Sequence, residues 1–228
     1  MGCLINFLQS PNLCSRPSDK QSENLKTLET TLGIVLATMD ARILETELLM
    51  GQIQRLNINT VLVNQSLHGI TCQAWCPQVR VINTDVIGLS KSRNEAIAHA
   101  NFDYAVICDD DVTLVEEGWR ELEKVVSSQT PACFLTRLLT PECKTWRQTY
   151  PHDTRIWRGI ALRQRMALMK VNSMELVVNV HFLREKKIRF HESFGLGSEK
   201  LCGGEEIVLM WQILKSGGKM TQLNLNLR

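Results

Sequence analysis

Short apolar runs alternate with helical patterns in the first half of the chain, and this alternation limits the fold more than any other feature. The apolar runs lie at residues 32–37, 60–63, 79–82 and 104–108. A helical spacing follows the first run at Leu44, Leu48, Leu49, Ile53 and Leu56, and a second helical stretch covers residues 90–100. Strands that alternate with helices form open, mostly parallel sheets. The pattern predicts an α/β fold: a mostly parallel mixed sheet flanked by helices.

The second half of the chain is less regular. Residues 116–126 have a helical pattern, whereas residues 132–136 and 176–183 are typical of strands. A last amphipathic helix is indicated by Ile207, Met210, Trp211 and Leu214, followed by Gly217 and Gly218 at its end. The strands and helices therefore continue to the end of the chain without a repeat.

Length and composition fit one globular domain. The chain has 228 residues, of which 44% are hydrophobic and 22% charged, a balance that excludes a disordered or fibrous protein. Residues 1–30 are polar and irregular, which predicts an extension before a domain at 31–228. No stretch reaches the ~18 apolar residues of a membrane span, and no signal peptide pattern opens the chain. We expect a cytoplasmic protein, with the inner face of a membrane as an alternative location.

Charge and cysteine usage exclude other classes of protein. The net charge is +2 and the basic residues are scattered, so no nucleic-acid partner is predicted. Lys186, Lys187 and Arg189 form the only tight basic cluster; a solvated turn is the favoured interpretation, and peripheral membrane contact is the alternative. The eight cysteines lack the spacing of a disulfide scaffold. Cys72 and Cys76 lack a second Cys/His pair at zinc-finger spacing, so zinc is not favoured.

Three carboxylates, Asp109, Asp110 and Asp111, directly follow the apolar run at 104–108. Adjacent carboxylates repel each other unless a cation is present. In an extended segment residues i and i+2 point to the same side, so Asp109 and Asp111 can approach one ion. Mg²⁺ takes one or two protein carboxylates and completes its shell with water and phosphates. The run predicts a metal site for a diphosphate substrate, with an acidic turn as the alternative.

Two further acids, Glu205 and Glu206, follow Gly203 and Gly204 at the start of the last helical pattern. Acids in the first turn of a helix are favoured by its dipole, by about 0.3–1 kcal/mol each. One of them can instead act as a general base that takes a proton from an acceptor hydroxyl. From these residues alone, both interpretations stay open.

Three segments in order resemble glycosyltransferases of family 2, which have the GT-A fold. The most detailed is GLSKSRNEAIAHANFDYAVICDDDV at residues 88–112, which resembles the G-L-S-x-x-R-N segment, short link and apolar strand with a D-x-D-type run of that family. LGIVLATMDAR at 32–42 is similar to its first strand and nucleotide loop. HESFGLGSEKLCGGEEIVLMWQILKSGGK at 191–219 resembles its later F-G-x-G and G-E-D/E block. The resemblance covers residues 32–219.

This resemblance implies site residues at matching positions. On the nucleotide side it implies Thr38, Asp40, Arg93 and Asn94. Asp109 and Asp111 would hold Mn²⁺ or Mg²⁺, and Asp110 would touch the ribose or donor sugar. Glu206 matches the catalytic base, with Glu205 beside it.

The sequence departs from the family pattern in three places. Asn64 and Gln65 stand where many relatives have an Asp-Asp-Gly-Ser segment, although an amide can still hydrogen-bond a nucleobase. Glu206 replaces the commoner Asp. The chain reaches Arg228 soon after its last predicted helix, where relatives continue with a strand, so we expect a domain that is short at the C-terminus.

The leading hypothesis is a metal-dependent glycosyltransferase that moves a sugar from a nucleoside diphosphate sugar to a saccharide or lipid-linked acceptor. The resemblance implies an inverting reaction and a role in surface-polysaccharide biosynthesis. A nucleotidyltransferase on a related fold and a non-catalytic nucleotide-sugar-binding protein are the alternatives. The sequence carries no signal for an oligomeric state.

Overall fold

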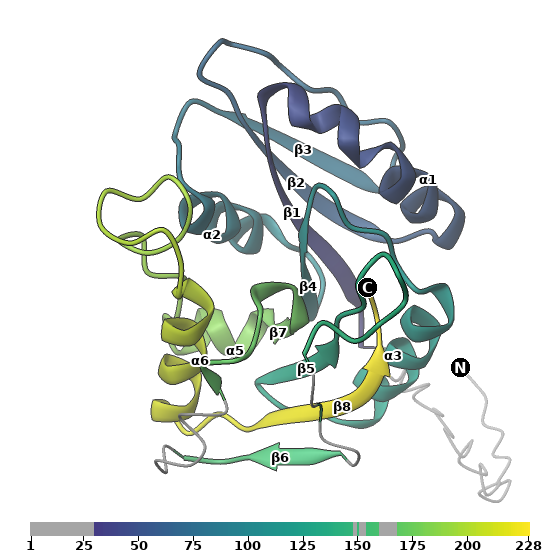
Figure 1. Ribbon diagram of the computed structural model, residues 1–228, viewed down its shortest axis with the longest axis vertical. Coiled ribbons are helices and arrows are strands. Elements are labelled where there is room, and N and C mark those ends of the chain that lie inside the picture. The colour runs from purple at the N-terminus through teal and green to yellow at the C-terminus, as the bar shows by residue number, and fades with distance from the viewer. Residues whose placement is uncertain (1–29, 148–149, 151–153, 160–167) are drawn as a thin grey trace, which may run out of the picture.

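The computed structural model describes residues 30–147, 150, 154–159 and 168–228 (Figure 1). The described strands form one eight-stranded sheet in the order β3-β2-β1-β4-β7-β5-β8-β6. They are β1 (Leu32–Met39), β2 (Asn59–Gln65), β3 (Val79–Thr84), β4 (Tyr104–Asp109), β5 (Cys133–Arg137), β6 (Arg155–Trp157), β7 (Leu176–Asn179) and β8 (Met220–Asn226). The helices are α1 (Glu47–Leu56), α2 (Leu89–His99), α3 (Glu116–Ser128), α5 (Val180–Glu185) and α6 (Glu205–Lys215), with 3₁₀ turns η1 (Asp40–Thr46) and η2 (Ser173–Glu175).

The sheet is mixed and its first half is parallel. β1 pairs in parallel with β2 and with β4, and β2 pairs in parallel with β3. β7 is antiparallel to both β4 and β5, β8 is parallel to β5, and β6 is antiparallel to β8. The predicted α/β class with a mostly parallel mixed sheet is confirmed. Because β1 and β4 are parallel neighbours, Ala37 lies beside Asp109, which brings both carboxyl ends to one edge.

Helices cover both faces of the sheet and enclose two apolar cores (Figure 1). Side chains alternate between faces along a strand, so Val35 joins one core while Ile34 and Leu36 join the other. The first core contains residues of α2, α5 and α6, including Ala96, Ile97, Leu183, Leu209 and Ile213. The second contains residues of α1 and α3, including Leu49, Ile53, Trp119, Leu122 and Val126. The parallel strands β1, β2 and β4 are thus covered on both sides, as their continuous apolar runs indicate, whereas β3 at the edge of the sheet is less buried.

The first predicted helix has a different buried face from the one that its leucines suggest. Leu44 and Leu48 are 75% and 72% exposed. The segment begins as the 3₁₀ turn η1, and α1 begins only at Glu47. The change from three to 3.6 residues per turn rotates the buried stripe, which then contains Leu49, Met50 and Ile53.

The predicted strand at 176–183 is wrong in its second half. β7 ends at Asn179, whose side chain accepts a hydrogen bond from the backbone N–H of Phe182 at 2.8 Å. Asparagine in this position caps a helix N-terminus, and α5 begins at Val180. β6 and β8 were not predicted.

A strand directly follows the last helix, which corrects the expectation that the chain lacks one there. β8 lies between β5 and β6 in the sheet. The expected extension at residues 1–30 lies outside the described residues except for Thr30. Among the residues that the structure describes, no helix combines the length and apolar character needed to cross a membrane.

β8 packs so closely on α3 that one helix position requires glycine. A Cβ atom on Gly118 would overlap the backbone carbonyl oxygen of Asn226. Gly51 in α1, by contrast, has open space around the position of a Cβ. Both glycines lie inside helices, so they form a matched pair in which one position excludes a Cβ atom and the other accepts it.

We expect Gly118→Ala to lower the free energy of unfolding by about 1–3 kcal/mol, the usual cost of forcing extra atoms into a packed site. Gly51→Ala should raise it by about 0.5–1 kcal/mol, because alanine is the better helix former. Urea denaturation of both variants measures the difference. A stabilising effect of Gly118→Ala would contradict the close packing of β8 on α3.

Candidate functional site

The candidate site lies at the edge where β1 and β4 end and α6 begins. Asp109 is the last residue of β4, and Glu205 is the first of α6. Gly204 precedes α6 with a φ of +87°, in the left-handed region that favours glycine. The sharp change of direction there places the first turn of α6 beside the strand ends, as the contacts of Arg93 demonstrate.

Arg93 from α2 joins these elements. Its Nη2 atom donates to Asp109 Oδ1 at 2.8 Å and to Ser173 Oγ at 3.0 Å, and its Nη1 atom donates to Glu205 Oε1 at 2.8 Å. Its guanidinium also lies 5.6 Å from the ring centroid of Phe190. The side chain is only 1% exposed. Arg93 therefore holds two acids of the site in place from inside the fold.

The side chain of Asp110 is buried and faces Thr38 and Arg42, whereas that of Asp109 faces Arg93. Its Oδ2 atom accepts from Thr38 Oγ1 at 2.8 Å and from Arg42 Nε at 3.0 Å, while Arg42 Nη2 donates to Oδ1 at 2.5 Å. The hydrogen bond to Asp110 is the main cause that raises the pKa of Arg42 above its ordinary value. Both Asp110 oxygens thus have a partner, and Asp110 links β1 to the end of β4.

Asp111 is the exposed member of the run, with 63% of its side chain accessible, and its Oδ2 atom lies 3.8 Å from Arg42 Nη2. Because β4 ends at Asp109, the alternation of an extended strand does not continue to Asp111. No cluster of three or more potential ligands (His, Cys, Asp or Glu) occurs among the described residues. A magnesium-type ion needs only one or two protein carboxylates when phosphates complete its shell. Asp109, which is 31% exposed, and Asp111 fit that requirement.

The two acids of α6 have different environments. Glu205 is 6% exposed and bound to Arg93, and its Oε2 atom is buried without a hydrogen-bond partner in the described structure. Glu206 is only partly buried. Burial is the largest effect on Glu206 and raises the pKa of its carboxyl above the ordinary value of 4.5; the charge of Glu205 raises it further, whereas Arg93 lowers it. A carboxylate with a raised pKa is a better proton acceptor.

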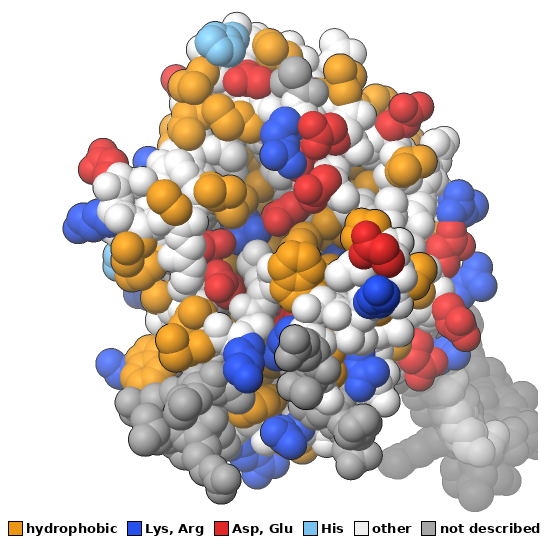
Figure 2. Space-filling view, viewed as in Figure 1, with side chains coloured by type: hydrophobic (Ala, Val, Ile, Leu, Met, Phe, Trp, Pro, Cys, Tyr) orange, Lys and Arg blue, Asp and Glu red, His pale blue; other side chains and the backbone are white. Residues whose placement is uncertain are grey.

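One cavity of about 380 Å³ is lined by the buried arginine and by three of the acids described above. Its lining includes Arg93, Asp109, Ser173, Glu205 and Glu206. Figure 2 shows acidic side chains gathered towards the middle of this face, with hydrophobic side chains next to them. The sequence-predicted metal ligand Asp109 and base Glu206 thus share one cavity. We call it the carboxylate cleft.

The other residues expected at the nucleotide lie at the ends of β1 and β2. Asn64 Nδ2 donates to Ile70 O at 2.9 Å and to Asn83 Oδ1 at 3.0 Å. Gln65 Oε1 accepts from the backbone N–H of Gly88 at 2.6 Å, and so fixes the start of α2. Two buried acceptors in this region, Asp40 Oδ1 and Asn64 Oδ1, have no hydrogen-bond partner within the described part of the chain.

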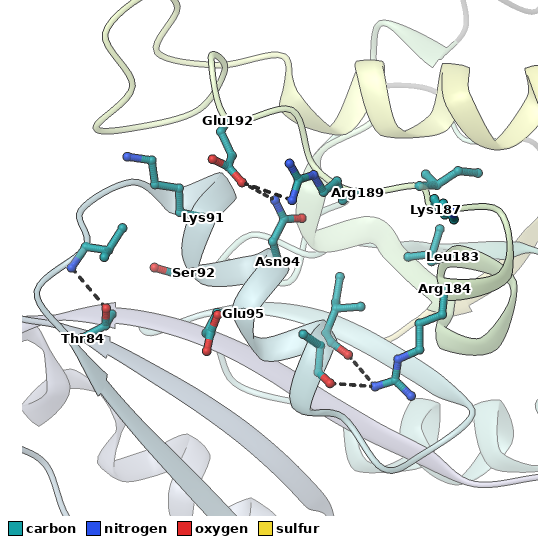
Figure 3. Close-up of a pocket in the computed structure, with 14 residues that line it drawn as sticks. Thr84, Lys91, Ser92, Asn94, Glu95, Leu183, Arg184, Lys187, Arg189 and Glu192 are labelled. Carbon is teal, nitrogen blue, oxygen red and sulfur yellow. Dashed lines mark hydrogen bonds and ion pairs between the residues drawn. The ribbon is translucent and has the colours of Figure 1, made fainter.

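Asn94 faces away from the carboxylate cleft. Its side chain donates to Phe190 O at 2.9 Å and accepts from Phe190 N at 2.8 Å. It lines a second cavity of about 840 Å³ between α2 and α5 (Figure 3). Lys91 and Arg189 line this cavity together with Glu95 and Glu192, so opposite charges are mixed there. Although it is the larger of the two, it lacks the concentrated acids of the carboxylate cleft.

Two site residues had no assigned role in the sequence analysis. Arg42 falls in the segment that resembles a nucleotide loop, but nothing in the sequence pairs it with Asp110. Ser173 lies in η2, which has no sequence signal, and reaches Arg93 only through the folded structure. Both connections span long sequence separations and depend on the sheet order.

Comparison with solved structures supports the fold. The chain is similar to S. aureus TarS 1–349 in complex with UDP-GlcNAc, with a TM-score of 0.67 and 15% identity over 87% of this chain and 57% of that chain. It is similar to the same protein in complex with UDP, with a TM-score of 0.64, 14% identity and coverages of 87% and 59%. The crystal structure of S. aureus TarS gives a TM-score of 0.66, 15% identity and coverages of 87% and 36%. The chain thus spans less than two thirds of each of these chains.

Sequence comparisons add the family. Comparison with curated proteins gives no match. The model of glycosyl transferase family 2 matches residues 59–188, which include β2, α2, β4 and the whole aspartate run. This match covers more than half of the chain and contains the most detailed of the three resembling segments. The chain therefore belongs to glycosyl transferase family 2 and has the GT-A fold of that family.

Proposed function

We propose that this protein transfers a sugar from a nucleoside diphosphate sugar to the hydroxyl group of an acceptor. The observation that carries the proposal is the carboxylate cleft, in which Asp109 at the end of β4 and Glu206 at the start of α6 line one cavity. In open α/β sheets, ligands bind at the carboxyl ends of the strands. Membership of glycosyl transferase family 2 supports the same reaction.

The nucleoside side of the donor is assigned to the ends of β1 and β2. The unpartnered acceptors Asp40 Oδ1 and Asn64 Oδ1 are suited to N–H or O–H donors of a base or ribose. Thr38 pairs with Asn64 across β1 and β2, and it is buried and hydrogen-bonded to Asp110. TarS, a protein of similar fold, has been solved with UDP-GlcNAc and with UDP, which supports a uridine nucleotide as the first donor to test.

The diphosphate side is assigned to Asp109 and Asp111, which would hold Mn²⁺ or Mg²⁺. Bound there, the ion would neutralise charge on the departing diphosphate. Among the ion pairs of the described residues, the one that includes Asp111 joins it to Arg42. We infer that Arg42 fixes Asp110 inward, so that Asp111 remains the exposed carboxylate of the run.

The transfer step is assigned to Glu206. Its carboxylate would take the proton of the acceptor hydroxyl, whose oxygen attacks the anomeric carbon as the bond to the diphosphate oxygen breaks. A base on the face opposite the leaving group produces inversion in a single displacement. Glu205 is less suited to this role because Arg93 already binds it. A saccharide or lipid-linked acceptor and a role in surface-polysaccharide biosynthesis complete the proposal.

The metal assignment is tested with Asp111→Asn. The thermal unfolding midpoint is measured with UDP, with and without Mn²⁺, since a ligand that binds the folded state raises that midpoint. We expect the variant to weaken manganese-dependent UDP binding by at least about tenfold, because loss of even an outer-shell partner of a metal ligand typically costs about 10–100-fold in affinity. Glu117→Gln, which removes one exposed charge on nearby α3, should behave like the parent chain. Equal manganese dependence in parent and Asp111→Asn would contradict the assignment.

The base assignment is tested with Glu206→Gln. We expect UDP binding to persist while the transfer rate falls by about 10²–10⁴-fold, the usual contribution of a general base. The exposed Glu199→Gln variant is the control.

The pH dependence of the parent gives an independent test of the same residue. Because burial raises the pKa of Glu206, the active carboxylate form is lost as pH falls through a value above 4.5. The acid limb of kcat/KM should therefore have its midpoint above 4.5, and Glu206→Gln should lack that limb. A midpoint at or below 4.5 would assign the base to another group.

A further inference from the structure

Three large apolar side chains are exposed on the wall of the carboxylate cleft. Trp146, Met169 and Leu196 line the cavity and are 56%, 67% and 64% exposed. They come from three separate segments: the loop after β5, the segment before η2 and the loop before α6. Folded proteins normally bury such side chains or use them for recognition when they cluster at a cavity. The cleft therefore combines its carboxylates with an apolar wall.

The backbone of Trp146 is held firmly although its indole is exposed. Its N–H donates to Leu138 O at 2.8 Å, and the loop is closed by a bridge between Leu139 and Thr145. The next residue, Arg147, forms an ion pair with the fully buried Glu175. A loop backbone that is already fixed before binding loses little conformational freedom when a ligand packs on its side chain. This rigidity favours a binding role for Trp146.

The charges in the cavity argue against an anionic ligand on this wall. Asp109, Glu205 and Glu206 outnumber Arg93 and Lys170 in the lining. Arg93 is bound to two of those acids. With the two positive charges of the proposed metal ion offset by the donor diphosphate, a phosphate or carboxylate of an acceptor would still meet net repulsion from this excess of acids.

The composition of the wall also argues against a lipid chain. Polar residues interrupt the apolar ones, since Lys170 follows Met169 and Asn172 lies close behind it. A lipid chain is stabilised only where a continuous apolar surface covers its methylene groups. A sugar ring needs the opposite arrangement, because one face carries C–H groups while the rim carries hydroxyls. An aromatic ring with polar neighbours matches that chemistry.

We propose that the apolar wall is the acceptor subsite and that a neutral saccharide acceptor packs the C–H face of its sugar ring on Trp146. This inference rests on the proposed transferase function and names its acceptor class. Packing on Trp146 would hold a sugar in the cavity that Glu206 also lines, so that a hydroxyl can reach the base. The role is in acceptor binding, which predicts an effect on the KM for acceptor with little change in donor binding.

The test uses the full chain with Mn²⁺ and two donors, UDP-GlcNAc and UDP-glucose. Neutral methyl glycosides and disaccharides of glucose, galactose and N-acetylglucosamine serve as acceptors. The variants are Trp146→Ala and Trp146→Phe, and Trp75→Ala is the matched control because Trp75 is 50% exposed and does not line the cleft. Donor hydrolysis without acceptor and UDP binding are measured in parallel.

We expect Trp146→Ala to raise the KM for acceptor about tenfold, the ratio given by about 1.4 kcal/mol. Donor hydrolysis and UDP binding should stay at the parental level, Trp146→Phe should retain most of the acceptor affinity, and Trp75→Ala should match the parent. An unchanged acceptor KM in Trp146→Ala would overturn the subsite. Transfer only to a lipid-linked or anionic acceptor, or donor hydrolysis without transfer to any neutral sugar, would also overturn it. Absence of donor binding and hydrolysis in the parent would instead refute the proposed function itself.

Discussion

The buried guanidinium of Arg93 is the interaction on which the site depends. A charge in the interior is costly unless it is paired and hydrogen-bonded, and Arg93 meets that condition with Asp109 and Glu205 at 2.8 Å each. One of these acids ends β4 and the other begins α6. Loss of one partner of a buried pair typically costs about 3–5 kcal/mol. The electrostatics of Arg93 therefore fix how the helix that carries Glu206 sits against the strand ends.

The aspartate run shows how one residue type acquires three environments from its place at a strand end. Asp109 is still part of β4 and is partly exposed towards the cleft. Asp110 lies in the following turn and is buried against Thr38 and Arg42. Asp111 faces solvent. Repulsion between neighbouring carboxylates is reduced because Arg93 and Arg42 each pair with a different member of the run, which leaves Asp111 the least compensated of the three.

The sequence predicted most where burial is continuous and least where the fold pairs distant residues. β1, β2 and β4 are covered on both faces, so their apolar runs identified them. β8 was not predicted because its sequence has no continuous apolar run: it includes buried polar residues such as Gln222, which donates to Leu135 O at 3.1 Å. In the site, the strand-end rule indicated the aspartate run, but the inward turn of Asp110 depends on Arg42 from another strand end. The opposite orientations of Arg93 and Asn94 follow from the helix they share, which has one face towards each cavity.

The same arginine also bears on the chemistry of the base. Burial and the charge of Glu205 both raise the pKa of Glu206, and Arg93 opposes that increase. A base needs a pKa high enough to accept a proton and low enough to be ionised at the working pH. Because Glu205 is tied to Arg93, the guanidinium offsets part of the charge that Glu205 presents to its neighbour. The salt bridge that positions α6 thus also limits the increase in the pKa of Glu206, so structure and reactivity at the start of this helix have a common physical origin.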